Sequence, residues 1–225
     1  ALLGVPVGDI DIATDATPET VTNLAISAGF RVVPTGIDYG TVTVIAGHVP
    51  HEVTTFRRDV ETDGRRAVVA FSRDVAEDAA RRDFTMNALY AQADGTVIDP
   101  LGGLPDLLAR QVRFVGDAGT RIREDYLRIL RFFRFHAWYA DPEGGIDAEG
   151  LAACAALSAG IETLSAERVG AEVKKLLSAP DPAPAVASMA QTGILAMVLP
   201  GAEARALAPA DATARFDAAT AAAAA

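Results

Sequence analysis

Two aspartates stand two residues apart near the start of the chain, in the stretch Gly8-Asp9-Ile10-Asp11-Ile12-Ala13-Thr14. If this stretch is a β-strand, both carboxylates lie on one face, because side chains alternate along a strand. Their Cα atoms would then be roughly 7 Å apart. Oxygen ligands at this spacing suit Mg²⁺, so the pair predicts a metal site for phosphoryl transfer. Taken alone, the stretch is equally compatible with an edge strand that carries two solvated aspartates.

Glu52 is a candidate for a third carboxylate. The β-branched stretch Gly40–Ile45 and the stretch His51–Arg57 predict the two strands of a hairpin. A hairpin strand beside the aspartate strand would direct Glu52 toward the same metal, and two-metal phosphoryl transfer commonly uses more than two carboxylate oxygens. The alternative for Glu52 is an ordinary surface position.

A second group of polar residues is Arg81-Arg82-Asp83, followed by Asn87. Guanidinium groups bind phosphate through two parallel hydrogen bonds, and Asp83 could accept a hydrogen bond from a ribose hydroxyl. The alternative is a helix C-terminus with favourable basic residues and a structural asparagine.

The stretch Glu124–Tyr139 predicts one long amphipathic helix. Within it, Asp125 and Arg128 share a face and place an acceptor beside a donor fork. Such a pair can mimic the Watson–Crick edge of a base, and Glu124 could orient the arginine. The alternative is an ordinary helix salt bridge.

The same helix continues with a basic stripe, Arg131 and Arg134, that could meet a triphosphate or an RNA backbone; a solvated helix face is the alternative. Trp138 and the neighbouring phenylalanines are predicted to belong to the core. A later helix, Ala166–Leu177, is predicted to expose one polar face that carries Glu167, Arg168, Glu172 and Lys175.

Composition narrows the class of protein. The single cysteine excludes an internal disulfide framework and a cysteine-based zinc site. No run of 18 apolar residues is present, so we expect no membrane span and a cytoplasmic protein. The net charge of −10 argues against nucleic-acid binding driven by overall charge, although five arginines fall between Arg121 and Arg134. The first residues lack both Met and a signal-peptide pattern, which predicts an internal fragment.

The order of predicted elements divides the chain into two main parts. We predict an α+β fold, with a mixed head at 1–114, an all-helical part at 115–200 and a partial body or uninterpreted tail at 201–225. Thr17-Pro18-Glu19 predicts a helix start. The charged stretch Arg58–Asp74 predicts a mobile loop.

Five motifs occur in an order that resembles one protein family, namely Gly8–Thr14, His51–Arg57, Arg82–Leu89, Asp99–Gly103 and Glu124–Arg131. The set closely resembles the class II tRNA nucleotidyltransferases (CCA-adding enzymes) and the related bacterial poly(A) polymerases of the DNA polymerase beta superfamily. Ser165-Ala166-Glu167-Arg168, with Glu172 and Lys175, resembles the last neck motif of that family.

This resemblance implies a nucleotidyltransferase head, in which helices flank a small β-sheet, followed by a helical neck and body. It implies that Asp9 and Asp11 bind two Mg²⁺ ions and that Glu52 is a supporting carboxylate. It further implies that Arg82 contacts the triphosphate and Asp83 the ribose of the nucleotide.

For the remaining polar residues the resemblance implies a supporting role for Asn87 and a position close to the nucleotide for Arg131. The protein template would consist of Asp125 and Arg128, which pair with the base of CTP or ATP, and of Glu124, which fixes the arginine.

The implied reaction adds C and A from CTP and ATP to the 3′ end of tRNA without a nucleic-acid template; no protein partner is expected. A bacterial poly(A) polymerase shares nearly every motif and is the first alternative. The family has Gly-Gly-x-x-Arg-Asp ahead of the aspartate pair, and this chain begins after that position. A non-catalytic nucleotide- or RNA-binding remnant is therefore a second alternative.

Overall fold

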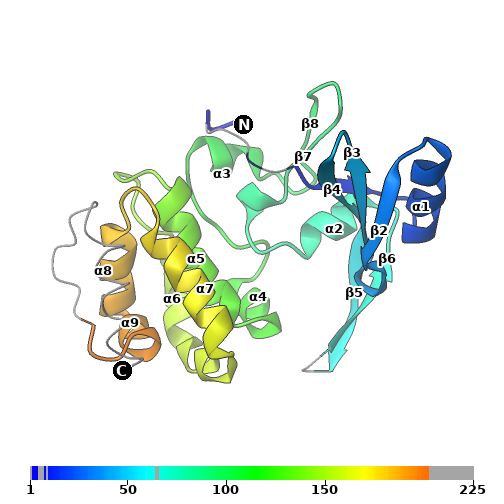
Figure 1. Ribbon diagram of the computed structural model, residues 1–225. Coiled ribbons are helices and arrows are strands. Elements are labelled where there is room, and N and C mark those ends of the chain that lie inside the picture. Colours follow the sequence, from blue (N-terminus) through cyan, green and yellow to red (C-terminus); the bar gives the residue numbers. More distant parts are fainter. Residues whose placement is uncertain (1, 5–7, 9, 64–65, 203–225) are drawn as a thin grey trace. The chain divides into compact units, whose positions relative to one another are not determined.

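The chain folds into two compact units (Figure 1). The structure, a computed structural model, describes residues 2–4, 8, 10–63 and 66–202, with only the backbone for residues 59–63 and 66–69. The sheet unit comprises Ala1–Arg82 and Ala88–Leu101, and the helical unit comprises Asp83–Asn87 and Gly102–Ala225.

The sheet unit is built on four strands in the order β1-β4-β3-β2. Strand β1 runs parallel to β4, whereas β4–β3 and β3–β2 are antiparallel pairs. This confirms the predicted hairpin and places its second strand directly beside β1, which begins one residue after Asp11. The strands are β1 (Ile12–Thr14), β2 (Arg31–Gly36), β3 (Thr41–Ala46) and β4 (Val49–Thr55).

Helix α1 (Pro18–Ser27) packs against β2, β3 and β4. It begins as predicted: the Thr17 hydroxyl accepts a hydrogen bond from the Thr20 N–H at 3.3 Å, and Pro18 occupies the first turn, where its missing N–H costs nothing. The rest of the sheet unit is formed by η1 (Ile37–Tyr39), α2 (Val75–Ala80), β7 (Tyr90–Ala91) and β8 (Val97–Ile98).

The predicted mobile loop at Arg58–Asp74 is wrong. Strands β5 (Arg57–Asp63) and β6 (Arg66–Phe71) form an antiparallel hairpin there. The signal in the sequence is Asp63-Gly64, a dipeptide that favours a turn, and Asp63 is the last residue of β5. Valines on both sides of it favour strands, and the high charge of the stretch concealed that pattern.

The helical unit surrounds an aromatic core. Phe84 lies with its ring centroid 5.0 Å from Phe114 and 4.8 Å from Phe135, and the rings of Phe114 and Phe132 stack at 5.3 Å. Its elements are η2 (Thr85–Asn87), α3 (Leu104–Leu108), α4 (Ala118–Glu124), α5 (Leu127–Tyr139), α6 (Ala148–Ala156), η3 (Ser158–Thr163), α7 (Ala166–Leu177), α8 (Ala183–Gln191) and α9 (Ile194–Val198).

Because of this core, the boundaries between the two units differ from the predicted boundary after residue 114. Residues 83–87 and 102–114 pack with the helices, because Phe84 and Phe114 are buried among the rings of α5. A close backbone contact adds to the constraint: a Cβ on Gly103 would lie 2.1 Å from the Thr85 carbonyl oxygen, so only glycine fits. The tail from residue 203 onward lies outside the described residues.

The single long helix predicted for Glu124–Tyr139 is also wrong. Helix α4 ends at Glu124, and Asp125 has the extended conformation φ −155°, ψ 107°. The Asp125 carboxylate accepts a hydrogen bond at 3.1 Å from the N–H of Leu127, the first residue of α5, and thereby forms a turn between the two helices. Aspartate favours such turns over helix interiors, because its side chain competes with the backbone for these N–H groups.

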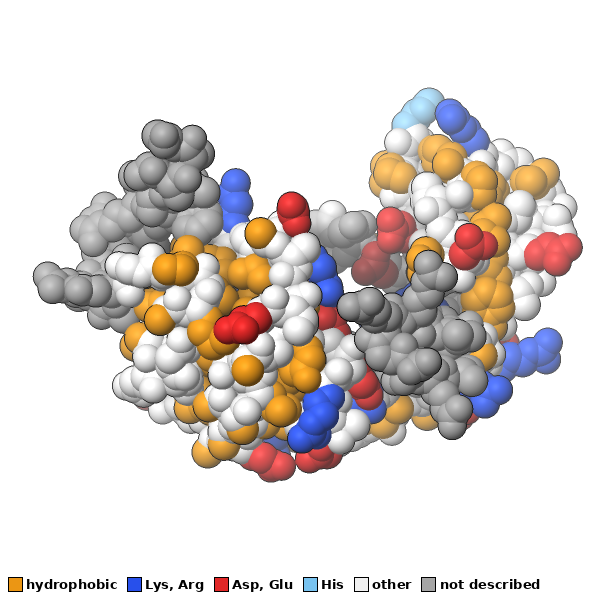
Figure 2. All heavy atoms as spheres, turned by 90° about the horizontal axis from the view of Figure 1, so that it is seen from below, with side chains coloured by type: hydrophobic (Ala, Val, Ile, Leu, Met, Phe, Trp, Pro, Cys, Tyr) orange, Lys and Arg blue, Asp and Glu red, His pale blue; other side chains and the backbone are white. Residues whose placement is uncertain are grey.

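The surface of the helical unit retains apolar side chains, which Figure 2 shows spread among isolated charges on the face in view. Phe132 and Phe133 are fully buried as predicted, but Trp138 is 41% exposed, so its predicted place in the core is wrong. Among the described residues, no helix is long and apolar enough to cross a membrane.

We predict that Phe132→Ala lowers the free energy of unfolding of the helical unit by about 3–5 kcal/mol, because it leaves a cavity in the aromatic core. Urea unfolding followed by fluorescence of Trp138, the one tryptophan of the chain, measures the change. The control Leu108→Ala, at a side chain that is 66% exposed, should change it by no more than about 0.5 kcal/mol. Equal midpoints for the two variants would contradict the assigned core.

Candidate active site

Asp11 and Glu52 lie on neighbouring strands of the sheet unit. Asp11 directly precedes β1, and the parallel register pairs Ile12 with Val53. Continued by one residue, this register sets Asp11 beside Glu52 on the same face of the sheet. Both residues are exposed. Asp9 lies outside the described residues, and within the described part of the chain no three acidic, His or Cys side chains form a metal-holding group.

Threonine hydroxyls cover the sheet face that carries Glu52. The Thr41 and Thr54 hydroxyls are 3.0 Å apart across β3 and β4, and those of Thr35 and Thr43 are 2.7 Å apart across β2 and β3. The register pairs Thr43 with Glu52 itself. This face is therefore polar, and cross-strand hydrogen bonds fix the strand that presents Glu52.

Arg82 binds the buried carboxylate of Asp78 in the sheet unit. Its Nη2 donates to the Asp78 Oδ2 at 3.0 Å, and the Tyr90 hydroxyl donates to the same oxygen at 2.7 Å. The Arg82 guanidinium also lies 5.7 Å from the centroid of the Tyr90 ring, within the range of a cation–π contact. The backbone N–H of Arg57 donates to the other Asp78 oxygen at 3.1 Å. The orientation of Arg82 is thus set by two neighbours.

This network shifts the pKa values of its members. Burial raises the pKa of Asp78, but the Tyr90 hydroxyl, the Arg82 charge and the Arg57 N–H outweigh burial, so the pKa lies below its usual value. Burial and the bond to Asp78 raise the pKa of the Tyr90 hydroxyl to about 12. At neutral pH the group is therefore a carboxylate that is shared between a cation and a phenol.

Asp83, the next residue along the chain, is anchored in the helical unit. Its side chain is 6% exposed, and its carboxylate accepts from the Arg131 Nε at 2.6 Å, from the Asn87 amide at 3.1 Å and from the Phe84 N–H at 3.0 Å. Three predicted site residues thus meet in one cluster. Of roughly four acceptor positions on a carboxylate, three are occupied.

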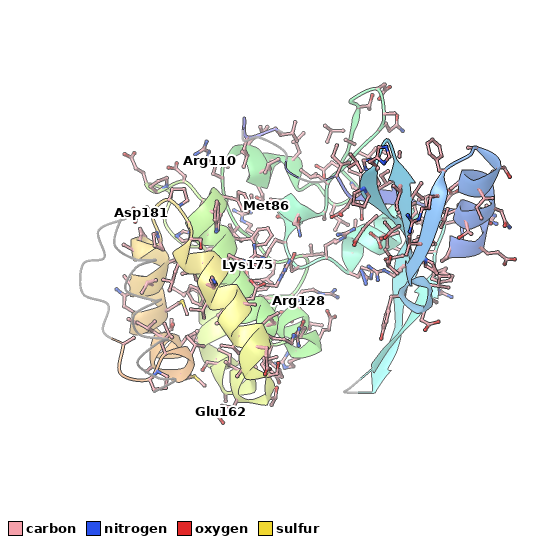
Figure 3. The ribbon with its side chains drawn as sticks, in the orientation of Figure 1. Met86, Arg110, Arg128, Glu162, Lys175 and Asp181 are labelled. Atoms are coloured by element: carbon pink, nitrogen blue, oxygen red, sulfur yellow. The ribbon has the colours of Figure 1, made fainter. Side chains whose placement is uncertain are left out.

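Glu124 and Arg128 form an ion pair at the junction of α4 and α5. The Arg128 Nη1 donates to the Glu124 carboxylate at 2.5 Å and to the Arg121 carbonyl at 3.0 Å. Figure 3 shows Arg128 at this junction. The carboxylate of Asp125 accepts from Arg168 of α7 at 2.7 Å. Asp125 and Arg128 are therefore neighbours at a break between helices, and each is fixed by a different partner.

Sequence reasoning missed the partners that hold these residues. Asp78 precedes Arg82 by four residues in a helical stretch, a spacing that signals an ion pair. No comparable local signal links Asp125 to Arg168, because they are 43 residues apart. The predicted solvated position is wrong for Glu172, which is 5% exposed and accepts from the Arg134 Nε at 2.6 Å.

Comparison with known proteins places this geometry in a family. The family model described as "Poly A polymerase head domain" matches residues 1–113. The chain belongs to the poly A polymerase head-domain family. A second model, "Probable RNA and SrmB- binding site of polymerase A", matches residues 145–205. The resemblance to the nucleotidyltransferases noted from the motifs is thereby confirmed.

The relatives similar to this chain are named as CCA tRNA nucleotidyltransferases or CCA-adding enzymes. The chain is 46% identical over 177 residues to "CCA tRNA nucleotidyltransferase 1, mitochondrial" of Homo sapiens, with coverage of 78% of this chain and 41% of the relative. It is 42% identical over 202 residues to the "CCA-adding enzyme" of Geobacillus thermodenitrificans, with 89% and 48% covered. The chain thus spans less than half the length of these two relatives.

A solved structure agrees with the fold of this family member. The Bacillus stearothermophilus CCA-adding enzyme in complex with CTP superposes with a TM-score of 0.76 at 39% identity. The match covers 89% of this chain and 47% of that one. The α+β class and the nucleotidyltransferase head predicted from the sequence are confirmed.

We predict that the stabilising effect of Tyr90 depends on pH. Because folding raises the pKa of its hydroxyl from 10.0 to about 12, the contribution is complete below pH 10 and is lost as the pH rises toward 12. The difference in melting temperature between the wild-type protein and Tyr90→Phe, followed by circular dichroism, should shrink over this interval. A difference that stays constant from pH 9 to pH 12 would contradict the network.

Proposed function

We propose that the protein adds C and A from CTP and ATP to the 3′ end of tRNA, as a template-independent nucleotidyltransferase. The observation that carries this proposal is the junction of α4 and α5, where the Arg128 guanidinium binds Glu124 at 2.5 Å and the Arg128 N–H donates to the Asp125 carbonyl oxygen at 3.0 Å. The names of the relatives, and the CTP in the solved complex, support the same activity.

The chemistry of Asp125 and Arg128 explains a preference for cytosine and adenine. Both bases present an exocyclic amino donor beside a ring-nitrogen acceptor. A carboxylate accepts from the amino group, and a guanidinium donates to the ring nitrogen. Uracil and guanine present the reverse order, a carbonyl oxygen beside a ring N–H. The carboxylate would then face the carbonyl oxygen, which is also an acceptor, and the guanidinium would face the ring N–H, which is also a donor. Such mismatches cost more than the matched bonds gain.

Arg82 is proposed to bind the triphosphate. Its guanidinium is positioned by Asp78 and Tyr90 before any nucleotide arrives, so little side-chain entropy is lost on binding. Asp83, with Asn87 and Arg131, follows at the next position; one acceptor position on its carboxylate would suffice for a ribose hydroxyl. The other three hold the cluster in place.

Asp11 and Glu52 would hold Mg²⁺ together with Asp9. The carboxylate oxygens of Asp11, directly before β1, and of Glu52, on the neighbouring parallel strand β4, fit that ion. When bound, Mg²⁺ neutralises charge on the phosphates and favours ionisation of the attacking hydroxyl. The 3′-hydroxyl of the RNA attacks the α-phosphate of the nucleotide, a phosphodiester bond forms, and pyrophosphate leaves. The protein contributes chiefly by positioning both reactants.

The proposal is tested with the purified protein, a tRNA transcript that lacks its CCA end, Mg²⁺, and labelled CTP or ATP. We expect C to be incorporated from CTP alone and A only after C. Incorporation of A without C would identify a poly(A) polymerase instead. No incorporation of either nucleotide would favour a non-catalytic binding module.

We predict that Asp11→Asn lowers the rate of incorporation by at least about a thousandfold, because the substitution removes a charged metal ligand that the transition state needs. Single-turnover assays at saturating Mg²⁺ measure the rate, and circular dichroism should show an unchanged fold, since Asp11 is exposed. The matched control Asp15→Asn, in the turn after β1, should retain the full rate. Near-normal activity of Asp11→Asn would refute the assignment.

We predict that Arg128→Ala impairs nucleotide choice more than RNA affinity. Loss of the guanidinium removes one half of the base-pairing edge, so discrimination of CTP against UTP, as a ratio of kcat/KM values, should fall roughly 10- to 100-fold, corresponding to about 1–3 kcal/mol. Arg123→Ala, at an exposed position of α4, is the matched control. An unchanged ratio for Arg128→Ala would exclude its role in base selection.

A further inference from the structure

The helical unit contains a groove between α5 and α7. It encloses about 450 Å³ and is lined by Arg134, Trp138, Tyr139, Lys174, Lys175 and Ser178. Its volume lies in the range of small-molecule sites. Figure 3 shows Lys175 on α7, which packs along α5. Both walls belong to one compact unit.

The groove is basic in a protein whose net charge is −10. Three cations and no carboxylate belong to its lining. Two of these cations contact the buried Glu172, which accepts from the Arg134 Nε at 2.6 Å and lies 3.7 Å from the Lys175 Nζ. The Lys175 side chain remains 63% exposed. Lysines at the end of a helix occur in any case, because they complement its dipole. The charge alone therefore does not identify a ligand.

The ligand of the groove is inferred from Trp138. It is 41% exposed, although large aromatic side chains are usually buried. Its indole N–H donates to the Lys175 carbonyl at 2.8 Å, which fixes the plane of the ring against α7. A fixed, accessible indole between cations is the arrangement by which proteins stack one base of a single strand and hold its phosphates.

The position of the groove suits a strand that ends at the template residues. Trp138 follows Arg128 by ten residues of the same helix. At 1.5 Å per residue this is about 15 Å along the helix axis, roughly four bases of a stacked strand at 3.4 Å each. A strand whose 3′ end lies near Arg128 can therefore reach Trp138 with an upstream nucleotide.

We propose that this groove binds an upstream nucleotide of the RNA strand, with the base stacked on Trp138 and the phosphates held by Lys174, Lys175 and Arg134. The inference rests on the proposed function, because RNA is the polymer that the protein would extend. It adds residues of α5 to the RNA-binding region, since the family model for RNA binding covers only 145–205.

The single tryptophan makes the test direct. Binding of the tRNA transcript without CCA should quench the fluorescence of Trp138. Trp138→Ala should raise the dissociation constant roughly 5- to 150-fold, as expected for loss of one stacked base, whereas Trp138→Phe should retain most of the affinity; labelled RNA reports binding by anisotropy for these variants. Circular dichroism verifies that both variants fold.

The lysines are tested by the dependence of binding on salt. Lys175→Gln should reduce the slope of log K against log salt by about 0.7, the value for one phosphate contact of a single strand. The matched control is Arg110→Gln, at a residue outside the lining of the groove. It should leave both slope and affinity unchanged. Equal effects of the two substitutions would overturn the proposal.

Other outcomes separate this proposal from the proposed function. If Trp138→Ala incorporates C and binds RNA with unchanged affinity, the groove is not an RNA-binding site. The proposed function is then unaffected. If RNA quenches the fluorescence of Trp138 but no nucleotide is incorporated, the proposed function is contradicted and RNA binding in the groove is supported. Equal quenching by CTP alone, or by polyglutamate, overturns RNA as the occupant in favour of a free nucleotide or of any polyanion.

Discussion

The buried carboxylate of Asp83 is the constraint on which the helical unit depends. It takes hydrogen bonds from Arg131 of α5, from Asn87 and from the Phe84 N–H, and it thereby holds the short segment 83–87 against α5. Removing Arg131 would leave the buried Asp83 carboxylate without its charged partner, which destabilises the fold. The same contacts set the place where Phe84 enters the aromatic core.

Arg82 and Asp83 are adjacent in sequence but are held in different compact units. Arg82 pairs with Asp78 in the sheet unit, whereas Asp83 pairs with Arg131 in the helical unit. A single peptide bond therefore joins the proposed triphosphate-binding arginine to the anchor of the proposed template region.

In this protein, whose net charge is −10, the arginines proposed to bind phosphate or base are each paired with an acid. Such pairing leaves the guanidinium charged and oriented, and it limits attraction to the site itself. The pairs are Arg82 with Asp78, Arg128 with Glu124, Arg131 with Asp83, Arg134 with Glu172 and Arg168 with Asp125. Recognition would thus depend on local geometry and not on net charge.

The sequence by itself determined the elements whose signals are local. The cap at Thr17, the alternating strand of β3 and the order of the motifs were sufficient to predict the α+β head, the sheet beside Asp11 and the family. Two expectations were wrong because local signals competed. The charge of residues 58–74 concealed the hairpin β5–β6, and a helical pattern concealed the turn at Asp125.

Only the tertiary structure decided which residues are partners. Asp125 meets Arg168, and Arg134 meets Glu172, over separations of 43 and 38 residues. Burial of Glu172 and exposure of Trp138 likewise depend on how α7 packs on α5. The physical reason is that helical periodicity fixes the face on which a side chain lies, whereas its solvent exposure and its partner depend on the element that packs against that face.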